Sequence, residues 1–374
     1  MKKSLLALAV AAMAASSVAS AATVYEKDGD SLGIYGRVQG VMYNGNTAAL
    51  NHYDDISLQA SGRLGFDMRT QLTQGVAGFA KMEWDVADGT RGADGGEWGV
   101  RYAWIGADFG QYGQIKGGRF EDATKYVLGP TDIYDDWGCY GQNGDGDKRN
   151  GIIMYSWNGY GVDVLASFQT AADDHEFRHF NRYDANKKKY VAIPVDIDMA
   201  GALAVGYKSA PVLFGPIAVK AGFGITKTQV DEPTSTDVLK NVNDYAFSAS
   251  WGDLAQGLYV AALYNHRTYE FDGNIADTDV DGVEFAVAYG FANGVSVRTG
   301  YQYKNIDDGE DEAEAHIVPV YVNYQINPRF NVWTEARFDV GTDEGDTKGE
   351  ASFKSLSGEG LLKPAFSVGA RYTF

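Results

Sequence analysis

Apolar and polar residues alternate along many segments of this chain. At the C-terminus the apolar set is Phe366, Val368, Ala370, Tyr372 and Phe374, and the opposite set is Ser367, Gly369, Arg371 and Thr373. The same alternation runs through 330–340, interrupted only by Trp333, and through 62–72. A repeat of two residues is that of a β-strand with two different faces. It predicts about sixteen strands, near 32–43, 62–72, 76–86, 97–109, 114–118, 151–157, 162–170, 199–208, 217–228, 244–251, 258–271, 282–289, 295–305, 316–325, 330–340 and 364–374.

The links between these strands decide which β-architecture the pattern describes. In a soluble sandwich the apolar faces pack into a core, whereas in an outer-membrane barrel they meet lipid and the polar faces line a wet lumen. Every second link is short, as in 73–75, 158–161, 291–294 and 326–329, and the links between them are roughly ten to thirty residues long and acidic. Short turns at one end and long loops at the other are typical of a barrel inserted from the periplasm. We therefore predict one all-β domain over 22–374, a 16-stranded antiparallel transmembrane β-barrel in the cell outer membrane.

The first residues have a different pattern. MKKSLLALAVAAMAASSVASA combines two lysines, an apolar run and a small-residue end, which predicts a signal peptide over 1–21 and export through the periplasm. No later stretch has the 18 consecutive apolar residues that a transmembrane helix needs. The net charge of −18 argues against nucleic-acid binding, which depends on cationic contacts with phosphates. The single Cys139 has no partner for an intramolecular disulfide.

Several segments, taken in order, resemble the general trimeric porins of Gram-negative outer membranes. They are VYEKDGDSLGIYGRVQG, SGRLGFDMRTQL, RYAWIGADFGQYGQIKGGRF and the terminal ARYTF, and the resemblance covers essentially the whole mature chain. It implies that the loop after the fifth strand, at 119–150, folds into the barrel and narrows the pore. It also implies a homotrimer in outer-membrane lipid and lipopolysaccharide, with passive diffusion of ions and small hydrophilic solutes, no enzymatic activity and no cofactor.

The resemblance also assigns residues to the pore constriction. Carboxylates at the loop tip match Asp132 and Asp136, and they face basic residues that match Arg37, Arg63, Arg101 and, less closely, Arg149. The tip itself departs from the family pattern, because it reads Tyr134-Asp135-Asp136-Trp137-Gly138-Cys139. Whether Asp135 or Asp136 faces the pore therefore stays open. Acidic loops favour cations at the pore mouth, whereas the arginines favour anions.

A sugar-specific channel, for instance for chitooligosaccharides, is an alternative. Such channels stack sugars on aromatic side chains, and Trp137 could begin such a track, with Tyr134, Asp135 and Tyr140 as further contacts. In the general-porin interpretation Trp137 is instead a packing anchor.

Two segments resemble metal-binding patterns. His175-Glu176-Phe177-Arg178-His179 matches the H-E-x-x-H pattern of zinc proteases, which requires a helix. Here it falls in a polar loop between predicted strands. The run DTDVDG from Asp277 begins like a calcium loop but has Ala288 where the bidentate glutamate is needed. We predict no metal site from either pattern.

Overall fold

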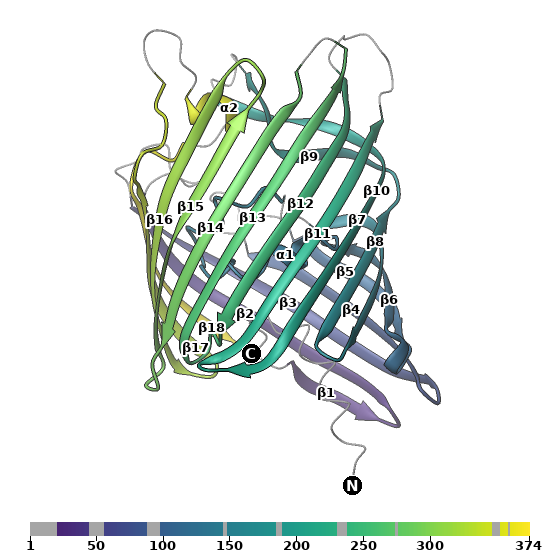
Figure 1. The fold of residues 1–374 in the computed structure, drawn as a ribbon. Helices are drawn as coiled ribbons and strands as arrows, with labels where there is room; N and C mark the ends of the chain where they lie inside the picture. The colour runs from purple at the N-terminus through teal and green to yellow at the C-terminus, as the bar shows by residue number, and fades with distance from the viewer. Residues whose placement is uncertain are drawn as a thin grey trace.

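The chain forms a closed antiparallel β-barrel (Figure 1). The computed structural model describes residues 21–44, 56–87, 98–144, 148–184, 189–229, 238–273, 276–345, 352–357 and 360–374. Residues 1–20, nearly all of the expected signal peptide, lie outside the described residues. Short turns lie at the lower end of the barrel in Figure 1, and the strand ends that the longer links join lie at its upper end, as the link lengths predict.

The strands of the described residues follow the predicted segments closely. They are β1 (Ala22–Lys27), β2 (Asp30–Asn44), β3 (Ile56–Thr73), β4 (Val76–Ala87), β5 (Gly99–Asp108), β6 (Gln114–Phe120), β7 (Arg149–Gly159), β8 (Val162–Gln169), β9 (Ala172–Asp184), β10 (Lys189–Val212), β11 (Gly215–Gln229), β12 (Val238–Gly252), β13 (Gly257–Asp272), β14 (Thr278–Gly290), β15 (Val295–Asp307), β16 (Glu312–Asn327), β17 (Phe330–Asp339) and β18 (Ala365–Thr373). Three short helices accompany them: η2 (Gly110–Tyr112), α1 (Lys125–Leu128) and α2 (Phe353–Ser357). Among the described residues no helix is both long and apolar enough to span a membrane.

The prediction of sixteen strands is confirmed. Of the 18 strands in the sheet, β1 only extends β2 at the base, and β8 and β9 share one position because both pair with β10. The ring closes where β18 pairs with β2, from Ser367 opposite Tyr43 to Thr373 opposite Arg37. One part of the prediction is wrong: most of the expected loop between 171 and 198 is strand, and the His175–His179 pattern lies in β9.

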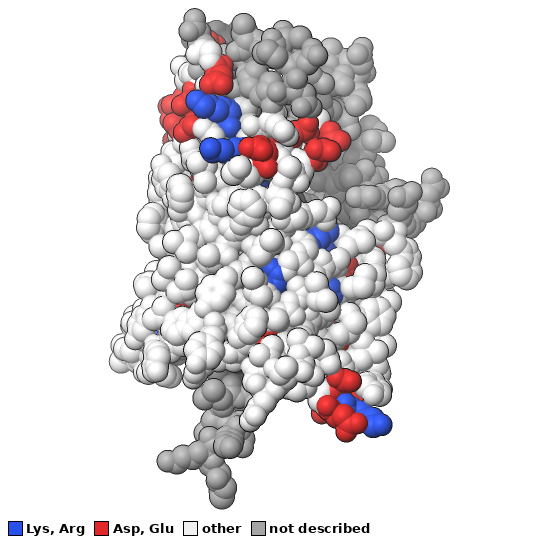
Figure 2. Space-filling model, turned by 90° about the vertical axis from the view of Figure 1, so that its right-hand side faces the viewer, with Lys and Arg blue, Asp and Glu red and all other residues white. Residues whose placement is uncertain are grey.

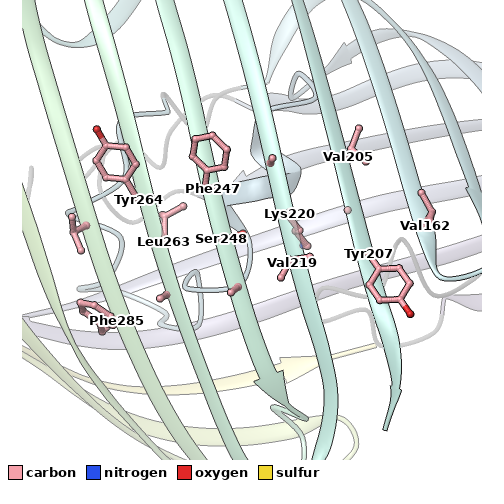
Figure 3. Close-up of a pocket in the computed structure, with 15 residues that line it drawn as sticks. Val162, Val205, Tyr207, Val219, Lys220, Phe247, Ser248, Leu263, Tyr264 and Phe285 are labelled. Atoms are coloured by element: carbon pink, nitrogen blue, oxygen red, sulfur yellow. The ribbon is translucent and has the colours of Figure 1, made fainter. Parts of the chain in front are cut away.

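The two faces of the wall differ as the alternation requires. Large apolar side chains point outward, including Val38, Leu58, Phe247, Phe285 and Val368. Figure 2 shows this outer surface as a broad band with few charged side chains, between charged groups gathered near the two ends. Over β10–β14 the band has a shallow apolar groove of about 720 Å³ bordered by Tyr207, Phe247 and Tyr264 (Figure 3). Such a band is the surface that a barrel presents to lipid.

The long link between β6 and β7 folds into the barrel. Arg119 and Phe120 still belong to β6, and Arg149 and Asn150 already belong to β7, so the loop comprises 121–148, narrower than the expected 119–150. We call 121–148 the constriction loop; the structure describes its residues 121–144 and 148. Its helix α1 packs Val127 and Leu128 against inward residues of the wall, among them Ile152, Ala204, Ala246 and Leu263.

Candidate functional site

The tip of the constriction loop is held by the side chain of Glu335 in β17. The backbone amides of Asp135, Asp136 and Trp137 donate to its two carboxylate oxygens at 3.0, 2.8 and 2.7 Å. Glu335 is 1% exposed, so this carboxylate is buried and obtains its hydrogen-bond donors from the loop backbone. Three charge-assisted hydrogen bonds to one group fix the position of the tip.

Asp136 is bonded to the barrel wall through both carboxylate oxygens. The hydroxyl of Tyr43 donates to one oxygen at 2.9 Å. The indole N–H of Trp333 and the hydroxyl of Ser367 donate to the other at 2.9 and 2.6 Å. Trp333, which interrupted the alternation of its strand, therefore points inward because it binds the loop.

Asp135 binds a different pair of wall residues and remains partly open to the lumen. Its oxygens accept hydrogen bonds from Arg371 at 2.6 Å and from the hydroxyl of Tyr321 at 2.7 Å. Burial alone would raise the pKa of the Asp135 carboxyl, but the charge and hydrogen bond of Arg371, the Tyr321 hydroxyl and the charge of Arg37 together lower it. Asp135 is thus an ionised carboxylate beside a group of arginines.

Behind the tip, the loop is fastened by buried polar residues of the wall. Glu284 in β14 accepts from the hydroxyl of Thr131 at 2.5 Å and from the amide of Gly141 at 3.0 Å. Asn265 in β13 accepts from the amide of Asn143 at 2.5 Å and donates to the carbonyl of Gly141 at 2.9 Å. Glu284 and Asn265 are 1% and 2% exposed; the hydrogen bonds of Glu284 come from the loop, and Asn265 also donates to the carbonyl of Gly282 in β14 at 3.0 Å.

The predicted arginines Arg37, Arg63 and Arg101 lie on β2, β3 and β5, on one side of the closure between β18 and β2. Arg37 is directly opposite Arg63 in the pairing of β2 with β3. Arg63 and Arg101 share the carboxylate of Asp85, at 2.9 and 3.2 Å, and Arg101 also contacts Glu83 at 2.7 Å. Arg37 has no carboxylate within ion-pair distance among the described residues.

The charged neighbours of Arg37 include Arg371, Arg63 and Asp135. Of the predicted arginines, Arg37 is thus a charged neighbour of Asp135, and Arg63 and Arg101 are charged neighbours of Arg37.

Two other predicted residues make contacts within the loop region. Asp132 pairs with Lys125 at 3.0 Å, and it accepts the thiol hydrogen bond of Cys139 at 3.2 Å. Arg149 pairs with Asp122 at the start of the loop. Among the described residues Asp132 forms no ion pair with the arginines of β2, β3 or β5, and the carboxylate that Arg149 contacts is Asp122 rather than one at the loop tip.

The aromatic residues of the tip pack against the wall. Trp137 is 7% exposed, with its ring edge-on to Tyr43 at 5.9 Å between centroids and the guanidinium of Arg337 5.6 Å from its ring. Tyr140 accepts a hydrogen bond from Arg337 at 3.0 Å. Gly138 lets the chain fold back, because a Cβ there would come within 2.5 Å of the side chain of Tyr134.

Sequence reasoning missed the wall residues that hold the loop, chiefly Arg371, Glu335, Glu284 and Asn265. A signal for two of them was present, because Arg371 and Glu335 lie on the polar faces of alternating strands. In the described part of the chain no group of three or more His, Cys, Asp or Glu residues could hold a metal ion. The His175–His179 pattern lies in a strand, not in the helix that a zinc protease needs.

Comparison with known proteins gives a consistent result. A family model described as Gram-negative porin matches residues 7–347. Outer membrane porin F of Salmonella typhi is 24% identical over 374 residues, covering 92% of this chain and 94% of the relative.

Solved structures give the same fold. Salmonella typhi OmpF in complex with daunomycin matches with a TM-score of 0.70 and 20% identity, covering 94% of this chain and 100% of that one. The trimer form of OmpT from Vibrio cholerae matches with a TM-score of 0.64 and 18% identity, covering 93% and 100%.

Proposed function

The chain belongs to the Gram-negative porin family, which makes it an outer-membrane channel for small hydrophilic solutes, and we propose that Arg37, Arg63 and Arg101 line its narrowest section together with Asp135. The observation that supports this proposal is the position of Asp135, which is fixed by Arg371 and Tyr321 beside Arg37. By contrast, both carboxylate oxygens of Asp136 accept hydrogen bonds from residues of the wall.

This arrangement sorts solutes without chemistry. Fixed cations on the wall and a carboxylate on the loop beside them create a field in the lumen, and pore-lining charges set selectivity in channels generally. Small polar solutes that align their dipoles pass, while apolar solutes must lose ordered water. The channel is passive on this proposal, with no enzymatic step, no cofactor and no energy source.

Arg37 is the arginine whose loss changes this field most. Arg63 and Arg101 are neutralised in part by Asp85 and Glu83. Arg37 has no carboxylate at ion-pair distance among the described residues, so its charge is the least compensated of the three. It draws anions toward the constriction, against the cation preference of the acidic loops.

Trp137 serves as a packing anchor rather than as a sugar platform. Only 7% of its surface is exposed, so little of either ring face is available to a saccharide. The aromatic track of a chitooligosaccharide channel would need that face open to the lumen.

We further propose that three copies assemble into a trimer, each with its own pore, within outer-membrane lipid and lipopolysaccharide. A solved relative, OmpT of Vibrio cholerae, is described in a trimer form. The apolar outer band is the surface that would meet lipid and neighbouring copies.

Planar-bilayer recording of the purified protein tests these statements. We expect ohmic conductance steps in groups of three, with no block by chitooligosaccharide at low concentration. Under a salt gradient, Arg37→Ser should shift the reversal potential toward cation selectivity. Arg329→Ser, which removes the same charge from an exposed turn, is the matched control. Equal shifts in the reversal potential of both variants would refute the proposed place of Arg37 at the constriction. Strong block by chitooligosaccharide would favour the sugar-specific alternative.

A further inference from the structure

A four-residue bulge of β9 folds into the mouth of the barrel. In the pairing of β9 with β10, Glu176 lies opposite Pro194 and Asn181 opposite Ala192, so Phe177–Phe180 face the single residue Ile193. Pro194 has no N–H to donate, which favours a break in the pairing at this point. His179 has a φ of 66°, which bends the strand further. We call Phe177–Phe180 the β9 bulge; β9 lies near the upper rim of the barrel in Figure 1.

The bulge covers an apolar patch on the inner side of the wall. Phe177 is 2% exposed and belongs to a buried cluster with Val242, Tyr269, Val280, Ile306, Ile317 and Phe353. All of these except Phe353, which belongs to α2, are wall residues on strands β12–β16, on the faces that carry Asn265, Glu284 and Lys304 further down. A lumen filled with water would not be lined by such residues, because burying apolar area is favourable only when water is excluded. The patch is therefore a docking surface for the bulge and for α2.

The bulge also holds the constriction loop. The guanidinium of Arg178 donates to the carbonyl of Gln142 at 2.8 Å and to that of Cys139 at 3.4 Å. The carbonyl of Arg178 itself accepts from the hydroxyl of Tyr269 in β13. One residue of the bulge thus connects the loop to the wall.

A buried lysine makes a second connection. Lys304 in β15 is 1% exposed and donates to the carbonyl of Gln142 at 2.8 Å. Its ammonium also lies 2.6 Å from Nε2 of His179 in the bulge. A buried ammonium needs acceptors, so Lys304 stabilises the loop and the bulge together.

We propose that the β9 bulge is a second constriction element, which positions the outer half of the constriction loop and closes the part of the mouth above β12–β16. This inference rests on the proposed channel function. Its consequence is that solutes enter on the opposite side, over β2–β6, where Arg37, Arg63 and Arg101 lie. Arg178 is a positioning residue in this scheme, because its guanidinium binds carbonyls of the constriction loop.

Two variants test the bulge, each with a matched control. Arg178→Gln removes the guanidinium that binds the loop carbonyls and leaves Phe177 in its cluster. Its control is Lys240→Ala, which removes one positive charge from an exposed site at the same rim. Phe177→Ala removes the aromatic anchor, and Phe247→Ala removes an outward phenylalanine from the lipid-facing band. Migration as a heat-sensitive folded species on gels shows which variants fold.

The readouts separate pore size from charge. In liposomes, uptake of neutral polyethylene glycols of graded size should extend to larger solutes for Arg178→Gln and Phe177→Ala, but not for the controls. Hydrogen exchange at the amides of Gly141 and Asn143 should rise about tenfold or more in Arg178→Gln, the equivalent of one lost hydrogen bond to a charged group. Unchanged size exclusion and exchange in Arg178→Gln, with an active wild-type channel, would overturn the proposal. A wild-type protein without channels would instead refute the proposed function.

Discussion

Glu335→Gln is the substitution that most directly tests how the loop tip is held. In the wild-type protein Oε2 accepts the amides of Asp135 and Asp136, and Oε1 accepts the amide of Trp137. Glutamine keeps a single carbonyl oxygen and replaces the other with an NH2 group. When that oxygen takes the Oε2 position, the amide of Trp137 faces a donor and stays unpaired.

The expected cost follows from these contacts. An unpaired buried donor costs about 1–3 kcal/mol, and the two remaining bonds lose the strength that a charged acceptor gives, so the closed tip loses about 3 kcal/mol in all. That free energy corresponds to a rise of roughly a hundredfold in the population with the tip released. The barrel wall should remain intact, because the backbone pairing of β17 with its neighbours is unchanged.

Hydrogen exchange with mass spectrometry measures this population directly, since protected amides exchange through local opening. We expect the amides of 135–137 to exchange roughly a hundredfold faster in Glu335→Gln. Single-channel current should also become noisier. Glu314→Gln, at the extracellular end of β16, is the control and should leave these amides unchanged. Equal exchange in the wild type and Glu335→Gln would show that the carboxylate does not hold the tip.

Three further predictions concern the tip and the wall. The pKa of Asp135 in the folded protein is lowered from its ordinary 3.8, so the ionised carboxylate stabilises the loop fully above that pH and loses this effect as the pH falls through the lower folded value. Acid below about pH 3.8 should therefore release the tip. Measured as conductance against pH, this step should be absent in Asp135→Asn. Trp137→Ala should lower the free energy of unfolding, measured by denaturant titration, by about 3–5 kcal/mol. A decrease of less than about 1 kcal/mol would contradict the role of Trp137 as a packing anchor. Gly36→Ala should lower the melting temperature, because the new Cβ would lie 2.5 Å from a backbone oxygen of β3, whereas Gly117→Ala, with no atom closer than 3.8 Å, should not.

The wall strands could be predicted from the sequence because the two faces of each strand meet different surroundings. Lipid outside and water inside impose a repeat of two on each strand, and all sixteen predicted segments correspond to wall strands. The strand β9 was missed because Asp173 and Asp174 lie at its start and a polar, lysine-rich stretch follows it. Its inward-turned residues pack on other protein rather than facing lipid and water, so the alternation that identified the wall strands is absent there.

The site was predictable only in part, for a related reason. Alternation places Glu335 and Arg371 on inward faces, but it cannot say which inward group binds which. Asp135 and Glu335 are 200 residues apart in the chain and meet only in the folded barrel. The family resemblance supplied Arg37, Arg63 and Arg101 and the inward loop. It did not indicate that Asp132 and Arg149 would form ion pairs with residues of the loop itself.

The contacts of Asp136 have a consequence for the order of folding. One carboxylate binds Tyr43 in the first wall strand, and also Trp333 and Ser367 in the last two. These strands become neighbours only when the two ends of the sheet meet, so the complete set of bonds cannot exist in an open intermediate. Bonds between such distant parts of a chain form late, because the entropy of closing the connecting chain must be overcome first. The protein should therefore narrow its pore in the same event that seals its wall, and a half-assembled sheet would carry the loop unattached.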